Sequence, residues 1–292
     1  MEMAEVKFVN FRRENQIHFG VKVEAGIIDV TEEAKKYSMQ MPASIEQYIN
    51  SGEIGSFALN ELMEREVQII PEGQVVYAPC VINPEKIICV GLNYVSHQDE
   101  CDITIPQEPI LFSKFNNALA AHNEKIVLPK SAVKFDYEAE LVIVIGKKAI
   151  NVSATDAINY VFGYTVGNDF SARDLQFRTG QWLLGKTCDK FAPIGPYLVS
   201  ADEINPDNLE ISCTVNGEIR QKANTGDMIF DCATIISYLS KYMTLQPGDI
   251  IFSGTPGGVI LGYPEEKQKW LRSGDIVAVS IEKIGTLVNI LK

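Results

Sequence analysis

Two glutamates, Glu138 and Glu140, are the first candidates for chemistry in this chain. With Asp136 they occupy every second position of the segment 136–141. Every second residue of a strand points to the same face, so the three side chains would lie together. Neighbouring carboxylates repel each other and are costly to bury, so protonation, arginines or a cation must compensate. Oxygen ligands without a nearby His or Cys favour Mg²⁺ or Mn²⁺ over Zn²⁺. On this motif alone, a strand end with its charges in water remains the alternative.

A third carboxylate, Asp169, follows the next predicted strand, 29 residues after Glu140. That separation allows a connection and a return strand, which would bring Asp169 back to the two glutamates. Asp169 could instead cap a helix predicted over 171–177, in which Arg173 and Gln176 would share one face. If the three acids converge, they form a site for one divalent cation per chain.

The elements that must position these acids are mostly strands. Strand-like segments are expected at 86–90, 140–145, 160–166, 197–199, 209–215, 249–252 and 276–281. Helices are expected only at 154–157, 171–177 and 232–242. Both faces of the segment after Glu140 are apolar, so this strand should enter a core. The absence of a strand–helix alternation predicts a β-rich α+β fold, mostly antiparallel, rather than a doubly wound sheet.

The first part of the chain is predicted to be a small α/β module. Strands are expected at 6–9, 18–23 and 27–30, and helices at 44–49 and 56–66. Prolines at positions 71, 79 and 84 mark the best candidate for a boundary. The prediction is a small N-terminal domain over 1–72 and a catalytic domain over 73–292.

Composition excludes several classes of function. The formal net charge is −12, and an acidic surface argues against nucleic acid and anionic membranes as partners. The longest apolar run, 141–145, is far too short to span a bilayer. Six cysteines without zinc-ligand spacing are expected to be reduced, and the N-terminus does not look like a signal peptide. The expected compartment is the cytoplasm.

Five ordered motifs carry a resemblance to a known family. They lie at 91–100, 136–141, 167–176, 185–186 and 253–259. From about residue 86 to the end, the chain closely resembles the fumarylacetoacetate hydrolase family, and its first part is similar to the small N-terminal domain of many bacterial members. The resemblance implies a β-sandwich roll as the catalytic core, a homodimer, and one Mg²⁺ or Mn²⁺ per chain held by Glu138, Glu140 and Asp169.

The resemblance also implies roles for other residues. Lys186 matches an active-site lysine, while Arg173 and Gln176 match a substrate-contacting pair. By the same comparison His97 and Glu100 match a His-x-x-Glu dyad on a mobile lid, where Glu100 would orient the imidazole for proton transfer. Thr255 is expected to contact the substrate, with a plain turn as the alternative.

The expected substrates are small 2-oxo or 1,3-dicarbonyl acids. The main hypothesis is hydrolysis of C–C bonds in acylpyruvate-like acids through a metal-bound pyruvate enolate. The alternatives are an oxaloacetate decarboxylase, an isomerase of unsaturated 2-oxo diacids of the 2-hydroxyhepta-2,4-diene-1,7-dioate type, and an idle metal-binding scaffold. One departure from the family pattern concerns the pocket: bulky Ile260 and Leu261 follow Val259, where many members have Gly directly after Val.

Overall fold

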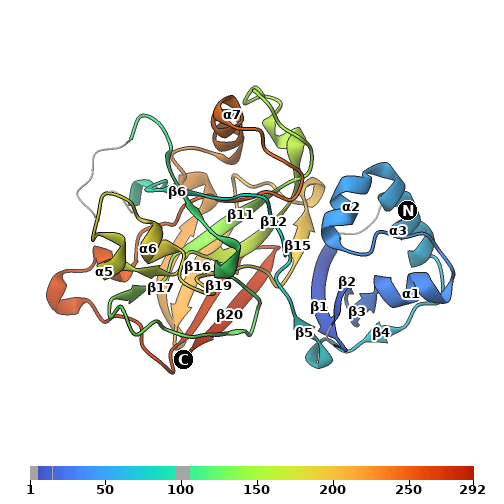
Figure 1. Cartoon of the computed structure of the whole chain (residues 1–292), viewed down its shortest axis with the longest axis horizontal. Coiled ribbons are helices and arrows are strands. Elements are labelled where there is room, and N and C mark those ends of the chain that lie inside the picture. The colour runs from blue at the N-terminus through green and yellow to red at the C-terminus, as the bar shows by residue number, and fades with distance from the viewer. Residues whose placement is uncertain (1–5, 15, 97–105) are drawn as a thin grey trace.

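The computed structural model describes residues 6–14, 16–96 and 106–292. Figure 1 shows a larger β-rich body and, to its right in blue and cyan, a smaller lobe made from the first part of the chain. Both parts combine helices with mostly antiparallel strands, which confirms the predicted β-rich α+β class. In the described ranges, no helix has the length and apolar character needed to cross a membrane.

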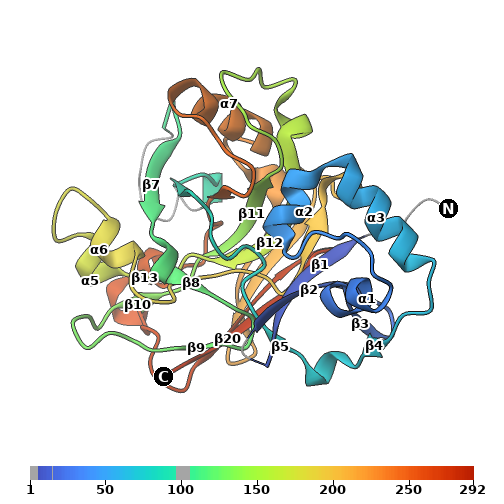
Figure 2. The same ribbon diagram turned by 45° about the vertical axis from the view of Figure 1, so that its right-hand side comes forward.

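The smaller lobe consists of strands covered by three helices. The strands are β1 (Lys7–Arg13), β2 (Gln16–Val23), β3 (Gly26–Asp29), β4 (Ile69–Ile70) and β5 (Val76–Tyr77). The helices are α1 (Val30–Lys36), α2 (Ile45–Ser51) and α3 (Glu53–Met63), and Figure 2 shows them beside the strands. Asp29 and Ser44 begin α1 and α2 by accepting hydrogen bonds from backbone N–H groups of the first turn.

One sheet continues from the smaller lobe into the larger one. Strand β1 pairs with β15 (Leu198–Ser200), and the sheet then runs through β12 (Val161–Asn168), β11 (Ala139–Ile145), β18 (Ile250–Phe252), β6 (Ile87–Gly91) and β7 (Ile110–Lys114). Strand β5 still pairs with β1, although it lies beyond residue 72. The division of the chain at 72 and 73 stays a prediction.

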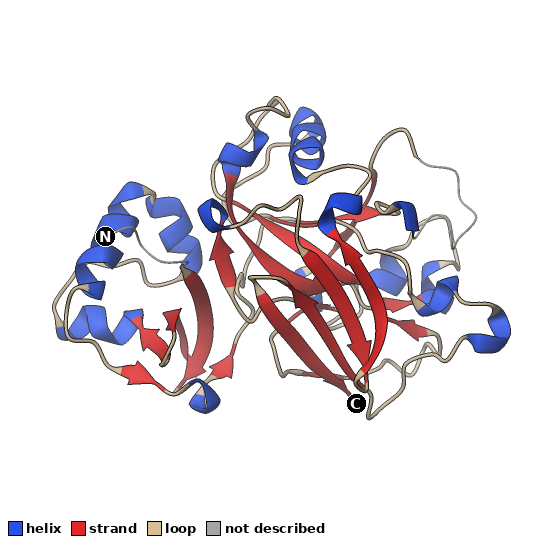
Figure 3. Ribbon diagram, turned by 180° about the vertical axis from the view of Figure 1, so that it is seen from behind, coloured by secondary structure: helices blue, strands red, loops and turns tan. Residues whose placement is uncertain are grey.

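A second sheet packs against the first in the larger lobe. It contains β17 (Glu218–Asn224), β16 (Glu210–Val215), β19 (Ile276–Ile281), β20 (Gly285–Leu291) and β9 (Lys125–Ile126). Figure 3 shows the long strands of this lobe running side by side. Two short pairs complete the strands, β8 (Leu119–Ala120) with β14 (Ala192–Pro193) and β10 (Phe135–Asp136) with β13 (Ser171–Ala172).

Strand β11 lies at the centre of this arrangement. All its residues are buried, as predicted: Leu141 and Ile143 belong to the core shared with the second sheet, and Val142 to the core shared with α2. Its register with β12 places Glu140 opposite Gly167, so the chain leaves β12 directly beside the two glutamates. This pairing explains why residues 29 positions apart in sequence meet.

Several predicted elements differ from the structure. The segment 136–141 was predicted to be one strand. It belongs instead to two strands, because β10 ends at Asp136 and β11 begins at Ala139. The helix expected at 154–157 is a turn followed by the 3₁₀ helix η3 (Ala157–Tyr160). The helix expected at 171–177 is β13 followed by α5 (Arg173–Gln176), and its N-cap is Ala172, so Asp169 is not its cap. Helix α7 (Cys232–Tyr242) has the predicted bounds.

Candidate metal centre

Glu138, Glu140 and Asp169 converge beside the junction of β10, β11 and β12. One oxygen from each carboxylate can be chosen so that all three lie within 4.8 Å of one another. The backbone fixes this approach: the Asp169 N–H donates to the Glu138 carbonyl (2.9 Å), and the Glu138 N–H donates to the side chain of Asn168 (3.0 Å). All three carboxylates are buried, so they do not form a solvated strand end.

Three cationic side chains surround two of these carboxylates. The Lys186 Nζ atom, at the end of α6 (Leu183–Lys186), lies 2.6 Å from Glu138 and 2.8 Å from Asp169. Lys114 Nζ lies 2.5 Å from Asp169, and Arg173 Nη2 lies 2.7 Å from Glu138. Burial alone would lower the pKa of Lys186, but the charges of Asp169 and Glu138 raise it above its usual value. The ammonium group is therefore held in its charged form.

Glu140 differs from the other two acids. Its carboxylate accepts a hydrogen bond from the Gly254 N–H (2.7 Å), and no cationic side chain of the described residues forms an ion pair with it. Burial, followed by the charges of Asp169 and Glu138, raises the pKa of Glu140 well above its usual range. A buried carboxylate without a counter-charge is costly, and a hard cation among three carboxylates removes that cost.

The net charge of the described site is compatible with a bound divalent cation. Buried carboxylates outnumber the cationic side chains by one; they are Asp136, Glu138, Glu140 and Asp169, against Lys114, Arg173 and Lys186. A divalent cation would turn the net charge of this group from −1 to +1. The residues present therefore fit Mg²⁺ or Mn²⁺, and the loaded site would attract an anionic ligand.

Arg173 connects the metal centre to the rest of the pocket. Its Nε and Nη2 atoms each lie 2.9 Å from the Asp136 carboxylate, and its Nη1 donates to the Gln176 side-chain oxygen (2.9 Å). Since the amide oxygen of Gln176 is used in this way, its amide N–H groups are the ones offered to a ligand. The carboxylates of Asp136 and Glu138 therefore fix Arg173, and Arg173 fixes Gln176.

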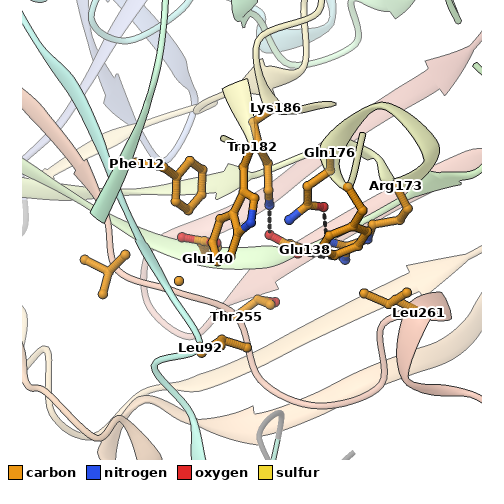
Figure 4. Close-up of a pocket in the computed structure, with 13 residues that line it drawn as sticks. Leu92, Phe112, Glu138, Glu140, Arg173, Gln176, Trp182, Lys186, Thr255 and Leu261 are labelled. Atoms are coloured by element: carbon orange, nitrogen blue, oxygen red, sulfur yellow. Dashed lines mark hydrogen bonds and ion pairs between the residues drawn. The ribbon is translucent and has the colours of Figure 1, made fainter. Parts of the chain in front are cut away.

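The described residues enclose a cavity of about 80 Å³ over the carboxylates. Figure 4 shows Trp182 beside Phe112, with Thr255 and Leu92 on the opposite side of the glutamates. The rings of Trp182 and Phe112 meet edge to face at 5.4 Å. A side chain at Gly91 would collide with the Trp182 ring, because its Cβ would lie 2.7 Å from that ring. Thr255 accepts a hydrogen bond from Gln221 (2.8 Å), which orients its hydroxyl.

Six of the nine predicted site residues line this cavity, and Asp169 lies beside them, with one carboxylate oxygen 2.8 Å from Lys186. The other two, His97 and Glu100, lie outside the described residues. Lys114 was not among the predicted site residues; it is buried and also donates to the backbone carbonyls of Phe170 and Phe191. Only its place at the end of a short apolar strand hinted at it, since nothing in a single sequence links residue 114 to residue 169.

Comparison with known proteins decides the family. The model of the C-terminal domain of fumarylacetoacetate hydrolase matches residues 86–292, well over half of the chain. The chain belongs to the fumarylacetoacetate hydrolase family. A homolog of fumarylacetoacetate hydrolase domain-containing protein 2 from Dictyostelium discoideum is 46% identical, covering 96% of this chain and 94% of that protein.

Two further family members are informative. The mitochondrial oxaloacetate tautomerase Fahd2a of Rattus norvegicus is 40% identical, covering 97% of this chain and 91% of its own. The solved structure of a fumarylacetoacetate hydrolase from Exiguobacterium antarcticum superposes with a TM-score of 0.86 at 32% identity, covering 98% of this chain and 99% of that one. It has the same fold, small N-terminal domain included. Eukaryotic relatives also align over nearly the whole chain, so the comparisons do not support a specifically bacterial type.

Proposed function

We propose that this chain is a divalent-metal enzyme that interconverts the keto and enol forms of oxaloacetate. The observation that carries the proposal is the buried triad of Glu138, Glu140 and Asp169 with the Lys186 ammonium against it. The likeness to an oxaloacetate tautomerase over nearly the full length of both chains favours this substrate over an acylpyruvate. The proposal keeps the metal chemistry of the expected hydrolase but changes the reaction.

The reaction moves one proton from carbon 3 of the acid to the oxygen on carbon 2, without oxidation or loss of atoms. Mg²⁺ or Mn²⁺, held by the triad, would supply a Lewis acid for adjacent carbonyl and carboxylate oxygens. Lys186 would stabilise the negative charge that develops on the substrate oxygen. Gln176 and Thr255 would orient the substrate through hydrogen bonds. His97 and Glu100 stay predicted as the pair that moves the proton.

The proposal is tested by following the enol of oxaloacetate by its ultraviolet absorbance. Free divalent ions also catalyse enolisation, so the matched control for each assay is the Glu140→Gln variant at the same Mn²⁺ concentration. The wild type should approach equilibrium much faster than this control, and EDTA should abolish the difference. A wild-type rate no higher than that of Mn²⁺ without protein would rule out the proposed activity, whereas a variant as fast as an active wild type would contradict the ligand assignment.

A second candidate is cleavage of the carbon chain at the same site. It is favoured by the superposition with a structure named as a fumarylacetoacetate hydrolase. Decarboxylation of oxaloacetate and hydrolysis of an acylpyruvate both release pyruvate, whereas tautomerisation does not. A coupled pyruvate assay with oxaloacetate and acetylpyruvate therefore separates the candidates. The homodimer and the cytoplasmic location stay predictions, and the name of the rat relative places that protein in mitochondria.

A further inference from the structure

The loop after β18 carries two bulky apolar residues side by side, Ile260 and Leu261. Ile260 is buried in the core between the two sheets, whereas its neighbour Leu261 lines the cavity over the carboxylates. Both belong to the 3₁₀ helix η6 (Ile260–Gly262). One side chain thus anchors this turn in the core, while the next forms part of the pocket wall.

The backbone of Leu261 is held on both sides. Its N–H donates to the Asp136 carboxylate (3.1 Å), as does the N–H of Ile260 (2.8 Å). Its carbonyl accepts a hydrogen bond from the Gln268 side chain (3.2 Å). Asp136 is fully buried and is itself fixed by Arg173. Moving the backbone of Leu261 would break these bonds or pull Ile260 from the core, so the backbone that carries this side chain is fixed in the pocket wall.

The position of this wall matters for a ligand. In Figure 4, Leu261 lies on the side of the pocket where Arg173 lies, away from Phe112. The cavity of about 80 Å³ is small beside the roughly 300–1,000 Å³ of pockets that hold larger ligands. An isobutyl side chain also offers no hydrogen bond to a polar group, so a longer acid directed this way would lose hydration without compensation.

We propose that Leu261 is a specificity-determining residue that limits the site to short 2-oxo acids, with a chain no longer than that of oxaloacetate. Asp136 is the positioning residue that holds Leu261 in place. The inference rests on the proposed function, because it concerns the length of that same substrate. The experiment therefore measures binding apart from turnover.

The test uses the fluorescence of Trp182, which lines the cavity. The chain has two tryptophans, so the Trp270→Phe background leaves Trp182 as the sole reporter. In that background, dissociation constants are measured for 2-oxo dicarboxylic acids of four, five and six carbons, with Mn²⁺ present. Exchange of the hydrogens on carbon 3 with D₂O, followed by NMR, reports enolisation of the same acids.

The Trp270→Phe protein that retains Leu261 should bind the six-carbon acid more weakly than the four-carbon acid. Its dissociation constant should rise on the order of tenfold for each added methylene. In Leu261→Ala the ratio of the two dissociation constants should fall by at least about tenfold. Ile260→Val is the matched control: it also trims an apolar side chain of η6, but one in the core, and should keep the original ratio.

The outcomes separate this inference from the proposed function. If the acids bind and exchange but Leu261→Ala keeps the length preference, the inference is wrong and the proposed function stands. An equal change in Leu261→Ala and Ile260→Val would also overturn the inference, since the effect would then come from the loop as a whole. If no 2-oxo acid binds the Mn²⁺-loaded protein, both fall together.

Discussion

Two carboxylates in this molecule, Glu140 and Glu72, have opposite surroundings. Glu72 lies where the smaller lobe meets the larger one, and it accepts hydrogen bonds from Tyr77 (2.5 Å) and Tyr197 and pairs with Lys22 (3.2 Å). Burial would raise the pKa of Glu72, but the bonds from Tyr197, Tyr77 and Lys22 together lower it below its usual value. The chain therefore satisfies the charge of Glu72 with its own groups.

Glu140 is more deeply buried than Glu72 and has one backbone N–H as its donor. Its pKa is raised rather than lowered, first by burial and then by Asp169 and Glu138. The comparison separates two kinds of charged cluster. Where donors of the protein satisfy a carboxylate, as at Glu72, the cluster stabilises the fold. Where a buried carboxylate lacks such donors, as at Glu140, the cluster is a candidate binding site for a cation.

The largest expected effect comes from removing the charge of Glu140. Glu140→Gln keeps the shape of the side chain but removes one ligand charge from the triad. Turnover of oxaloacetate should fall to the rate given by free Mn²⁺, because a bound metal contributes several kcal/mol to such a reaction. The melting temperature without metal should hold or rise, since a buried charge is removed. Full turnover in this variant would contradict the ligand assignment.

Lys186→Met tests the cation that faces the same centre. Methionine has a similar length without the charge, so kcat should fall by about 100-fold as charge on the substrate loses its stabilising partner. The affinity for Mn²⁺ should not weaken, because a competing positive charge has gone from between Glu138 and Asp169. Lys190→Met is the control, since that lysine pairs with Glu124 at the surface. A kcat within threefold of wild type would exclude a role for Lys186.

Glu72→Gln should have a smaller effect, on stability alone. The amide keeps the shape but loses charge-assisted hydrogen bonds, so the free energy of unfolding should fall by about 1 kcal/mol. Urea denaturation measures this change, and the Mn²⁺-dependent rise in melting temperature should remain intact. If Glu72→Gln removed that rise, the distinction between the two clusters would fail.

The smallest expected effect is a change in the acid sensitivity of folding. A carboxyl whose folded pKa lies below its unfolded value stabilises the protein above the unfolded pKa, and this stability disappears as pH falls through the folded pKa. The pKa of Glu72 is lowered from 4.5. Wild type should therefore lose more stability than Glu72→Gln between about pH 5 and pH 3 in parallel urea titrations. Identical slopes would show that Glu72 adds nothing to acid unfolding.

The sequence predicted the central strand well, because every residue from Leu141 to Ile145 is apolar and both faces of the strand are buried. It also predicted which carboxylates meet, once the ordered motifs added Asp169 to Glu138 and Glu140. It did not reveal the break between β10 and β11, since the acids at 136, 138 and 140 alternate across the break as they would along a single strand.

Long-range partners were the part that one sequence could not supply. Lys114 meets Asp169 across 55 positions, and Tyr197 meets Glu72 across 125 positions. Each of these residues would fit equally well on a surface if only its neighbours in sequence were known. Periodicity reports which face of a strand is buried, but not which residue from another element lies against it.

The most direct test of the account is the stoichiometry of Mn²⁺ binding, measured by electron paramagnetic resonance of the free ion. One bound ion per chain is expected in wild type and in Glu72→Gln, and none in Glu140→Gln at the same concentrations. Equal binding by Glu140→Gln and wild type would contradict the claim that Glu138, Glu140 and Asp169 hold the cation on which the proposed chemistry depends.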